Sequence, residues 1–333
     1  MVGPPLPLVG HIAFGVIDRG TNVLQVRPST LCPHNCIYCS VDAGPSSRTR
    51  RAEFLVEPEY IARWVGVIAQ FKGVSVEALI DGVGEPLAHP QILEIIRLLR
   101  KTPLVGRIAL ETHGGFLSRH LVRKLAEAGL DRINLSLDTL DPEKARLLSG
   151  VPWYDVERVV RVVEYAVKET SIDVVLTPVV VPGINEDDMR DLIDLAKSLR
   201  LGEKSGWPTG VLIQKYEEHR YGRKVRGVKA WSWARFYKWL RELEEETGYR
   251  LKPGMEELGF RKAPKLPAPY RRGEEVILRV VSEGWHKGEL LAVTARGDRV
   301  MALYCNGDKR CSPGVRVRAR IVRDKDNIYV ARA

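Results

Sequence analysis

The chain has few cysteines and no long apolar run, and both absences limit what it can be. Only five of its 333 residues are cysteine, and three of these fall within eight positions, at Cys32, Cys36 and Cys39. This spacing is unlike a disulfide framework and fits a reducing compartment, so we expect a cytoplasmic protein. No apolar stretch approaches the ~20 residues that cross a bilayer, so we expect no membrane contact. Segment 1–10 has no basic flank, which argues against a secretory signal.

Low-complexity tracts and internal repeats are also absent, which leaves an ordinary globular protein. Hydrophobic residues make up 44% and charged residues 28% of the sequence. The length predicts one large domain and one small one. We expect the protein to be a monomer.

The net charge of +10 is concentrated at the end of the chain. Residues 271–333 contain 14 lysines and arginines against 8 acids, a net +6, whereas the preceding 270 residues carry only +4. Clustered cations displace counterions from nucleic acid, so a polyanion-binding appendage is one interpretation. A solvated basic face is the other, and charge alone leaves both open.

Between residues 22 and 214, short apolar runs alternate with longer amphipathic stretches. Each run is compact enough to be a buried strand of a parallel sheet, and the stretch after it has helical periodicity. Ser118 and Asp141 are N-cap signals, and Gly129 ends a helix. Repeated units of this kind predict an α/β fold, a partial (β/α)6 TIM-like barrel. The expected strands are 23–26, 78–81, 108–111, 133–137, 174–181 and 211–213, and the expected helices are 58–71, 90–99, 118–128, 156–167 and 187–199.

The pattern changes after residue 214. A charged, aromatic stretch covers 215–229, a helix is expected at 231–247, and three prolines near 264–269 indicate a linker. Five short β-prone runs follow and predict a small all-β barrel of TRAM or OB type. These runs are 276–281, 289–294, 299–304, 315–322 and 328–331. We therefore divide the chain into an N-terminal extension (1–21), the α/β core (22–250), a Pro-rich linker (251–270) and the β-barrel (271–333).

The cysteine triplet carries the clearest chemical signal. Cys32, Cys36 and Cys39 follow the first expected strand, at the end where parallel α/β folds place their active sites. Three thiolates can bind three irons of a cubane cluster and leave the fourth iron open to a substrate. A zinc site would need a fourth ligand, for which His34 lies in the same tight loop. A redox pair of Cys36 and Cys39 would leave Cys32 without a role.

The triplet, with aromatic Tyr38 directly before its third cysteine, resembles the signature of the radical S-adenosylmethionine superfamily, and the resemblance extends to about residue 250. It implies one four-iron four-sulfur (4Fe-4S) cluster and S-adenosylmethionine, which one-electron reduction splits into methionine and a 5′-deoxyadenosyl radical. It also implies a low-potential electron donor such as ferredoxin or flavodoxin, and it places Tyr38 among the cofactor-binding residues. The chain would then bind, orient and shield the cofactor.

Two turns resemble cofactor-binding segments of this family. Residues 82–86, Gly-Val-Gly-Glu-Pro, look like its glycine-rich turn, in which Gly84 and Glu85 receive the methionine ammonium. Glycine permits the close backbone approach that this contact needs. The end of the fifth expected strand is similar to the segment near the adenine, with backbone contacts from Val181 and Pro182.

The fourth expected strand supplies further candidates. Asn134, Ser136 and Asp138 alternate with apolar residues, so their side chains share one face. The matching strand of the family contacts the ribose or the methionine carboxylate, which assigns Ser136 and Asp138 to the cofactor. Asp138 could instead cap the helix that follows. His113, after the third strand, is left without an assigned role.

The tail from about residue 271 resembles a TRAM domain, a small β-barrel with which certain RNA-modifying enzymes hold RNA. Alternate positions on one expected strand form a basic stripe. The expected RNA contacts are Arg316, Arg318, Arg320, Lys287 and Arg310, with further contacts from Trp285 and from the 215–229 stretch, including Tyr216, Tyr221, Arg220, Arg223 and Lys224.

These features together predict a radical enzyme that modifies a base in RNA, and tRNA is the expected partner. Methylthiotransferases of the family carry three further cysteines in an N-terminal domain, whereas no cysteine precedes Cys32 here. One alternative is a radical enzyme that acts on a small molecule, lipid or peptide. The other is a non-catalytic iron–sulfur RNA-binding protein that senses redox state.

Overall fold

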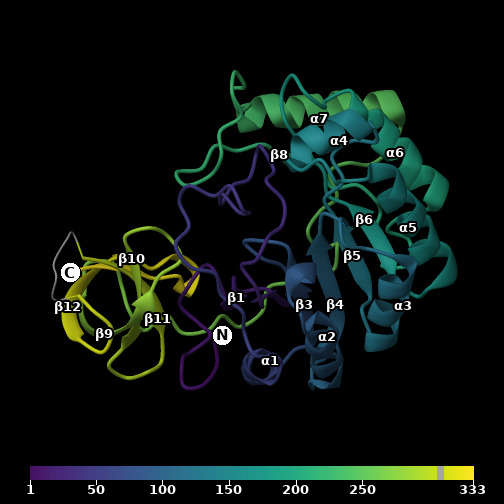
Figure 1. The fold of residues 1–333 in the computed structure, drawn as a ribbon. Helices are drawn as coiled ribbons and strands as arrows, with labels where there is room; N and C mark the ends of the chain where they lie inside the picture. The colour runs from purple at the N-terminus through teal and green to yellow at the C-terminus, as the bar shows by residue number, and fades with distance from the viewer. Residues whose placement is uncertain (306–310) are drawn as a thin grey trace. The chain divides into compact units, whose positions relative to one another are not determined.

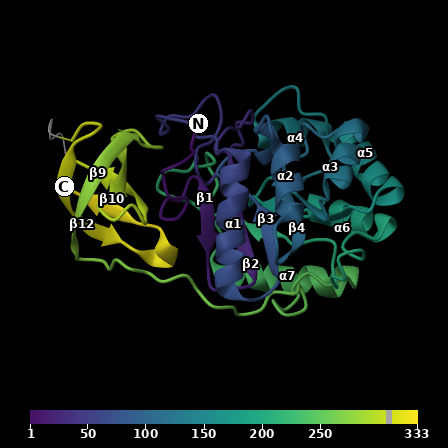
Figure 2. The ribbon, with the colours of Figure 1, turned by 90° about the horizontal axis from the view of Figure 1, so that it is seen from below.

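The computed structural model describes residues 1–305 and 311–333, which form two compact units (Figure 1, Figure 2). The first unit comprises Met1–Leu31, Ser47–Gly106 and Lys262–Ala333, and the second comprises Cys32–Ser46 and Arg107–Arg261. Within these residues, no helix is both long enough and apolar enough to cross a membrane.

The first unit contains three neighbouring strands with helices packed beside them. β1 (Gly15–Asp18) pairs antiparallel with β2 (Val23–Arg27), and β2 pairs parallel with β3 (Val76–Ile80). The predicted helices are present as α1 (Pro58–Lys72) and α2 (Ile92–Lys101). We predicted no strand before residue 23. Only four residues join β1 to β2, and so short a turn can connect only antiparallel strands.

A buried ion pair ties α1 to β1. Lys72, in the last turn of the helix, places its Nζ 2.7 Å from Asp18 Oδ1 and donates to the carbonyl of Pro264 at 2.8 Å. Asp18 also accepts the N–H groups of Gly20 and Leu266, at 2.8 and 2.7 Å. The segment around Pro264 is therefore bonded to the body of this unit.

His89 is a second buried polar group of the first unit. Its Nδ1 accepts the N–H of Gln91 at 3.1 Å, so Nε2 carries the proton that points to the carbonyl of Val56 at 3.0 Å. Burial lowers the pKa of His89. The folded chain therefore resists a proton that the unfolded chain takes up below pH ~6.5.

This difference predicts that stability falls as the pH is lowered from about 7 to about 5.5. The contribution of His89 is at most about 1.4 kcal/mol per pH unit. Urea unfolding of the wild type and of His89→Gln measures it, and the wild type should lose stability more steeply. If the free energy of unfolding falls with pH equally in the two proteins, His89 does not cause the pH dependence.

The second unit repeats the strand–helix pattern. Its strands β4 (Val105–Thr112, beginning just before the boundary), β5 (Arg132–Leu135) and β6 (Asp173–Leu176) pair in parallel. The predicted helices are present, and a further short one follows the Asp141 cap. They are α3 (Arg119–Ala128), α4 (Pro142–Ser149), α5 (Val156–Glu169), α6 (Asp188–Leu199) and α7 (Trp233–Thr247).

Two predicted strands of this unit differ from the structure. The expected strand 174–181 is divided into β6 and β7 (Val179–Val180), because Pro178 between them has no N–H to continue a ladder. β7 pairs in parallel with β8 (Gln214–Lys215), so the last strand begins just after the expected 211–213. Residue Val211 contributes only an isolated bridge to Leu176.

The C-terminal residues form the predicted five-stranded barrel, which is closed in the order β10-β11-β13-β12-β9. Its interior is apolar and includes Leu278, Met301, Ile321 and Tyr329. The strand boundaries agree with the apolar runs of the sequence to within about two residues. They are β9 (Glu275–Glu283), β10 (Glu289–Thr294), β11 (Val300–Tyr304), β12 (Arg316–Arg323) and β13 (Val330–Arg332).

Cys305 and Cys311 form a disulfide at the end of β11, with their Cα atoms 6.3 Å apart. The sequence showed no disulfide framework, and we did not predict this bond. The two cysteines are only six positions apart in the sequence. Neither one is a free thiol in this structure.

The N-terminal segment packs on the barrel within the first unit. The carbonyls of Val9 and Gly10 accept the N–H groups of Val300 and Tyr329, at 3.1 and 2.8 Å. Gly10 has φ +127°, and a Cβ there would collide with the carbonyl of Val300. Only glycine allows the two backbones to approach so closely.

The buried carboxylate of Glu289 collects donors beside this contact. It accepts hydrogen bonds from the His11 ring, the Trp285 N–H and the Tyr304 hydroxyl, at 3.0, 2.9 and 3.1 Å. Although burial raises the pKa of Glu289, the bond from His11 and the charges around it hold that pKa below its ordinary value. The carboxylate is therefore charged, and its role is to bind these three donors within the first unit.

Candidate functional site

The cysteine loop lies in the second unit, against the end of α4. Asn35 and Ile37 donate their N–H groups to the carbonyls of Ser149 and Leu148, at 3.0 and 3.1 Å. A Cβ on Gly150 would collide with the carbonyl of Asn35. Its φ of +67° also favours glycine. The helix end therefore fixes the loop through its backbone.

None of the three cysteines of the loop is in a disulfide, and nitrogen groups contact the sulfurs of Cys36 and Cys39. The N–H of Ala43 donates to Cys39 Sγ at 3.1 Å, and Nε2 of His113 lies 3.5 Å from Cys36 Sγ. The other ring nitrogen of His113 lies 3.3 Å from the carbonyl of Ser136. Burial raises the pKa of the Cys36 thiol, so a metal must displace its proton on binding.

His34, inside the same loop, is packed among aromatic rings. Its ring centroid lies 5.0 Å from those of His113 and Trp153. Within the described part of the chain, neither of its ring nitrogens has a hydrogen-bond partner. Burial and the neighbouring His113 lower the pKa of His34 to about 3, so the ring is neutral.

Arg223 clamps the cysteine loop from a distant part of the chain. Its guanidinium pairs with Asp42 at 2.9 Å and donates to the carbonyls of Cys36 and Ala43, at 3.1 and 2.5 Å. Its own N–H donates to the carbonyl of Cys39 at 2.8 Å. The expectation that Arg223 contacts RNA was wrong, because its donors are occupied by the loop.

Tyr216 was also expected to contact RNA and is buried instead. Only 1% of its surface is exposed, and its hydroxyl accepts the N–H of Val225 at 3.0 Å. In the 215–229 stretch the sequence shows the charges and rings, but it does not show which of them point inward.

The clamp predicts that Arg223→Met weakens iron retention. Groups that hold metal ligands in place commonly affect metal affinity by about 10- to 100-fold, so we expect at least tenfold faster iron release to a chelator. Arg220→Met is the matched control, since Arg220 is exposed and contacts the neighbouring Tyr221 ring. Equal release rates for both variants would contradict the assignment.

Ser136 and Asp138 line a pocket with His113 and Tyr154. Asp138 is buried and accepts the Tyr38 hydroxyl and the Val179 N–H, the latter at 2.8 Å. Burial raises the pKa of this carboxyl. The second unit thus contains the cysteines and five of the expected cofactor residues, Tyr38, Ser136, Asp138, Val181 and Pro182.

Two expectations about this segment were wrong. β5 ends at Leu135, where the chain turns and Leu137 N–H bonds the carbonyl of Leu135 at 2.9 Å, so the alternation does not continue along a strand. Asn134 is instead engaged by Arg132 at 2.8 Å. Asp138 does not cap α4, because Asp141 accepts the first N–H groups of that helix.

Asn185, which the sequence analysis did not single out, organises the turn around Val181. Its side chain accepts the Val181 N–H at 2.8 Å and donates to the carbonyls of Asp138 and Val179, at 2.9 and 3.0 Å. The Val181 carbonyl accepts the Ile184 N–H at 3.0 Å. In the sequence, an asparagine two residues after a Pro-Gly pair is the local signal that could have indicated this role.

The glycine-rich turn follows β3 in the first unit. A Cβ on Gly84 would collide with the carbonyls of Thr30 and Leu31, which lead into the cysteine loop. Glu85 is buried, donates its N–H to Leu31 at 2.7 Å, and accepts the N–H of Leu87 at 3.0 Å. Glycine at position 84 is therefore required by close packing of two backbones.

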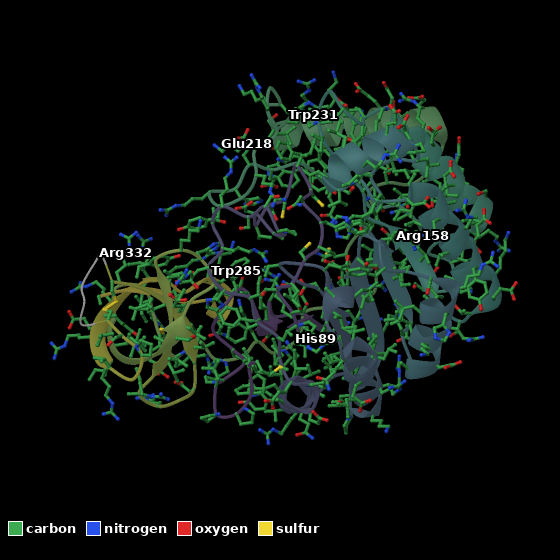
Figure 3. The ribbon with its side chains drawn as sticks, viewed as in Figure 1. His89, Arg158, Glu218, Trp231, Trp285 and Arg332 are labelled. Carbon is green, nitrogen blue, oxygen red and sulfur yellow. A yellow bond between two sulfur atoms is a disulfide. The ribbon has the colours of Figure 1, made fainter. Side chains whose placement is uncertain are left out.

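The arginine stripe is exposed on β12, as predicted from alternation. Arg316, Arg318 and Arg320 alternate with inward residues. Glu275 on β9 lies 3.8 Å from Arg318 and 3.0 Å from Arg320. The neighbouring strands add Arg279, opposite Arg316, and Arg332, which is opposite Arg320 and is labelled in Figure 3.

The remaining residues that were expected to contact RNA differ in their exposure. Lys287 is exposed in the loop between β9 and β10. Arg310 lies outside the described residues. Trp285 is only 2% exposed, so it cannot stack on RNA, and that expectation was wrong.

Comparison with known proteins identifies the family. The sequence model of the Radical SAM superfamily matches residues 26–196, about half of the chain, including the cysteine triplet and the glycine-rich turn. The chain belongs to the radical SAM superfamily. This radical SAM protein is 35% identical to an uncharacterized protein of Methanocaldococcus jannaschii, over 99% of this chain and 79% of that protein.

Other relatives match part of this radical SAM protein. It is 38% identical to a probable GTP 3′,8-cyclase of Pyrococcus abyssi over 54% of this chain, which corresponds to only 56% of that relative's length. The structure of Streptococcus suis SuiB bound to S-adenosylmethionine has a TM-score of 0.50 at 19% identity, covering 69% of this chain and 51% of SuiB. At this identity the likeness shows the fold alone.

The family determines the cofactors of this radical SAM enzyme, one 4Fe-4S cluster and S-adenosylmethionine. The donor set fits the cluster: three free thiols lie on one loop that α4 and Arg223 hold in place. A triplet leaves one iron without a protein ligand. The zinc site and the redox pair are thereby replaced as interpretations of these cysteines.

Proposed function

We propose that this radical SAM enzyme modifies a base in RNA, with tRNA as its substrate. The exposed arginine stripe of β12 carries the proposal. Arg316, Arg318 and Arg320 stand on one face of a closed β-barrel, and Arg279 and Arg332 extend that face. Phosphate contacts of this kind supply affinity without reading sequence. The resemblance of residues 271–333 to a TRAM domain supports the same interpretation.

A second basic surface in the second unit also supports RNA binding. Without Lys215 and Arg223, which are held within the unit, residues 215–241 contain seven exposed lysines and arginines against two acids, a net +5. On α7, Trp233 and Tyr237 are about half exposed and stack on each other with centroids 5.6 Å apart. Exposed aromatic rings beside cations are the usual platform for unpaired bases.

The residues around the cofactors would divide the work as follows. Cys32, Cys36 and Cys39 would hold the cluster, and the bound cofactors supply a 5′-deoxyadenosyl radical. The turn at Gly84 and Glu85 would receive the methionine ammonium. Ser136 and Asp138 would contact the ribose or the methionine carboxylate, and the backbone of Val181 and Pro182 would lie at the adenine. Tyr38 would be a further cofactor-binding residue. An electron donor such as ferredoxin or flavodoxin would supply the electron.

Binding of tRNA at several salt concentrations tests the proposal. Each neutralised phosphate contributes roughly 0.7–0.9 to the slope of log affinity against log salt, so replacing Arg316, Arg318 and Arg320 by Ser should lower that slope by about 2. Uncoupled cleavage of S-adenosylmethionine should remain. The control replaces three exposed arginines of helices, Arg97, Arg123 and Arg161, each of which also pairs with an acid. No tRNA binding by the wild type at low salt would reject the proposal.

A free purine nucleotide is a second candidate substrate, because several relatives are GTP 3′,8-cyclases. The holoenzyme, reduced with dithionite, would be given S-adenosylmethionine with either tRNA or GTP. The RNA proposal predicts that adding tRNA increases the formation of 5′-deoxyadenosine. It also predicts that a nucleoside of changed mass is found in the tRNA after the reaction. Conversion of GTP with unchanged tRNA would favour the nucleotide, and absence of 5′-deoxyadenosine would favour the redox sensor.

A further inference from the structure

Arg50 connects the glycine-rich turn to the C-terminal barrel, and all three parts belong to the first unit. Its guanidinium donates to the carbonyls of Thr30, at 2.7 Å, and of Val83. Val83 lies within the turn 82–86, and Thr30 belongs to the backbone on which Gly84 packs. The Arg50 side chain therefore links Thr30, which follows β2, to Val83, which follows β3.

The barrel holds this guanidinium through Trp285. The guanidinium carbon of Arg50 lies 4.9 Å from the Trp285 ring centroid, and both side chains are buried. Backbone bonds fix the contact on either side: Arg51 N–H donates to the Trp285 carbonyl, and Lys287 N–H donates to that of Thr49, both at 2.8 Å. The ring, labelled in Figure 3, comes from the loop between β9 and β10.

The surroundings make Arg50 dependent on this ring. Its acid partner, Glu53 at 3.2 Å, has a side chain that is about one third exposed, so water screens this ion pair. A cation is attracted to an aromatic face most strongly where water is excluded, as it is at Trp285. Without the ring, the guanidinium would gain water or move, and the Val83 carbonyl would lose its donor.

We propose that Arg50 is a positioning residue for S-adenosylmethionine binding, and that Trp285 of the barrel holds Arg50 in place. This inference rests on the proposed role of the turn at Gly84 and Glu85. The barrel then has two separable tasks: the arginine stripe contacts RNA, and the Trp285 loop supports the cofactor turn. Changes at the stripe leave the cofactor unaffected, whereas changes at Trp285 weaken its binding.

The dissociation constant of S-adenosylmethionine, measured on the reconstituted holoenzyme by equilibrium dialysis, tests the inference. Trp285→Leu and Arg50→Met should each raise it by about tenfold or more, with iron content unchanged. Trp285→Phe keeps an aromatic face, so its dissociation constant should stay within about threefold of the wild-type value. Leu303→Ala is the control, because it creates a cavity in the barrel core away from Arg50 and should lower only the unfolding midpoint.

Two outcomes would overturn the inference. One is an unchanged constant in Trp285→Leu and Arg50→Met; the other is a constant that rises equally in Leu303→Ala, which would indicate general loosening of the barrel. Glu85→Gln separates this test from the proposed function. If Glu85→Gln binds S-adenosylmethionine as the wild type does, the assignment of the turn fails; if only Glu85→Gln weakens binding, the turn stands and the role of Arg50 and Trp285 fails.

Discussion

Replacing Cys36 by Ala is expected to leave the protein without its iron–sulfur cluster. Each of the three cysteines would bind a different iron of the cluster, so loss of one would leave two irons without a protein ligand. Cys36 is also the buried member of the triplet. Iron and sulfide analysis after anaerobic reconstitution should fall from about four irons per chain to near zero, and the absorbance near 400 nm should disappear.

The other two cysteines of the chain provide the matched control. Cys305 and Cys311 are joined to each other at the end of β11, so the double replacement by Ser should keep the full iron content. If the cluster survives in Cys36→Ala and is lost in the Cys305/Cys311 variant, the ligands have been assigned to the wrong cysteines.

Lys72→Met is expected to cause a large loss of stability, because it breaks a buried ion pair of the first unit. Asp18 is buried, and its cationic partner at 2.7 Å would be gone. Removing one partner of a buried ion pair commonly costs about 3–5 kcal/mol. The free energy of unfolding, from urea titration, should fall by that amount.

Asp18→Asn in the same chain should recover part of this loss. The double variant has no isolated charge. The single side-chain oxygen of Asn can still accept one of the two N–H groups, from Gly20 or from Leu266, that now bond the two oxygens of Asp18. Lys101→Met, at the exposed end of α2, is the control and should change stability by less than about 0.5 kcal/mol. A small effect of Lys72→Met itself would mean that water reaches Asp18.

Local patterns predicted most of the fold. Apolar runs and capping residues gave the helices and the strands of the barrel, because those signals lie within a few residues of one another. β1 was missed because a strand of four residues has too short a pattern to recognise. The broken strand at Pro178 was missed because the apolar run continues on both sides of the proline.

Without the family resemblance, the candidate site could be predicted only where its residues are neighbours in the chain. Cys32, Cys36 and Cys39 are such a group. Arg223 is 187 residues from the Cys36 carbonyl that it bonds, and Arg50 meets a tryptophan from the barrel. Such contacts depend on folding, and in the sequence these arginines are only positive charges. The same holds for Trp285, whose aromatic character favoured a surface contact that burial excludes.

The central claim is that three cysteines hold a cluster whose remaining iron binds S-adenosylmethionine. Electron paramagnetic resonance of the anaerobic, dithionite-reduced protein tests it most directly, with and without added S-adenosylmethionine. We predict the signal of a reduced 4Fe-4S cluster whose g values shift when S-adenosylmethionine is added. A colourless protein that contains zinc or no metal, or a cluster signal that S-adenosylmethionine leaves unchanged, would contradict the claim.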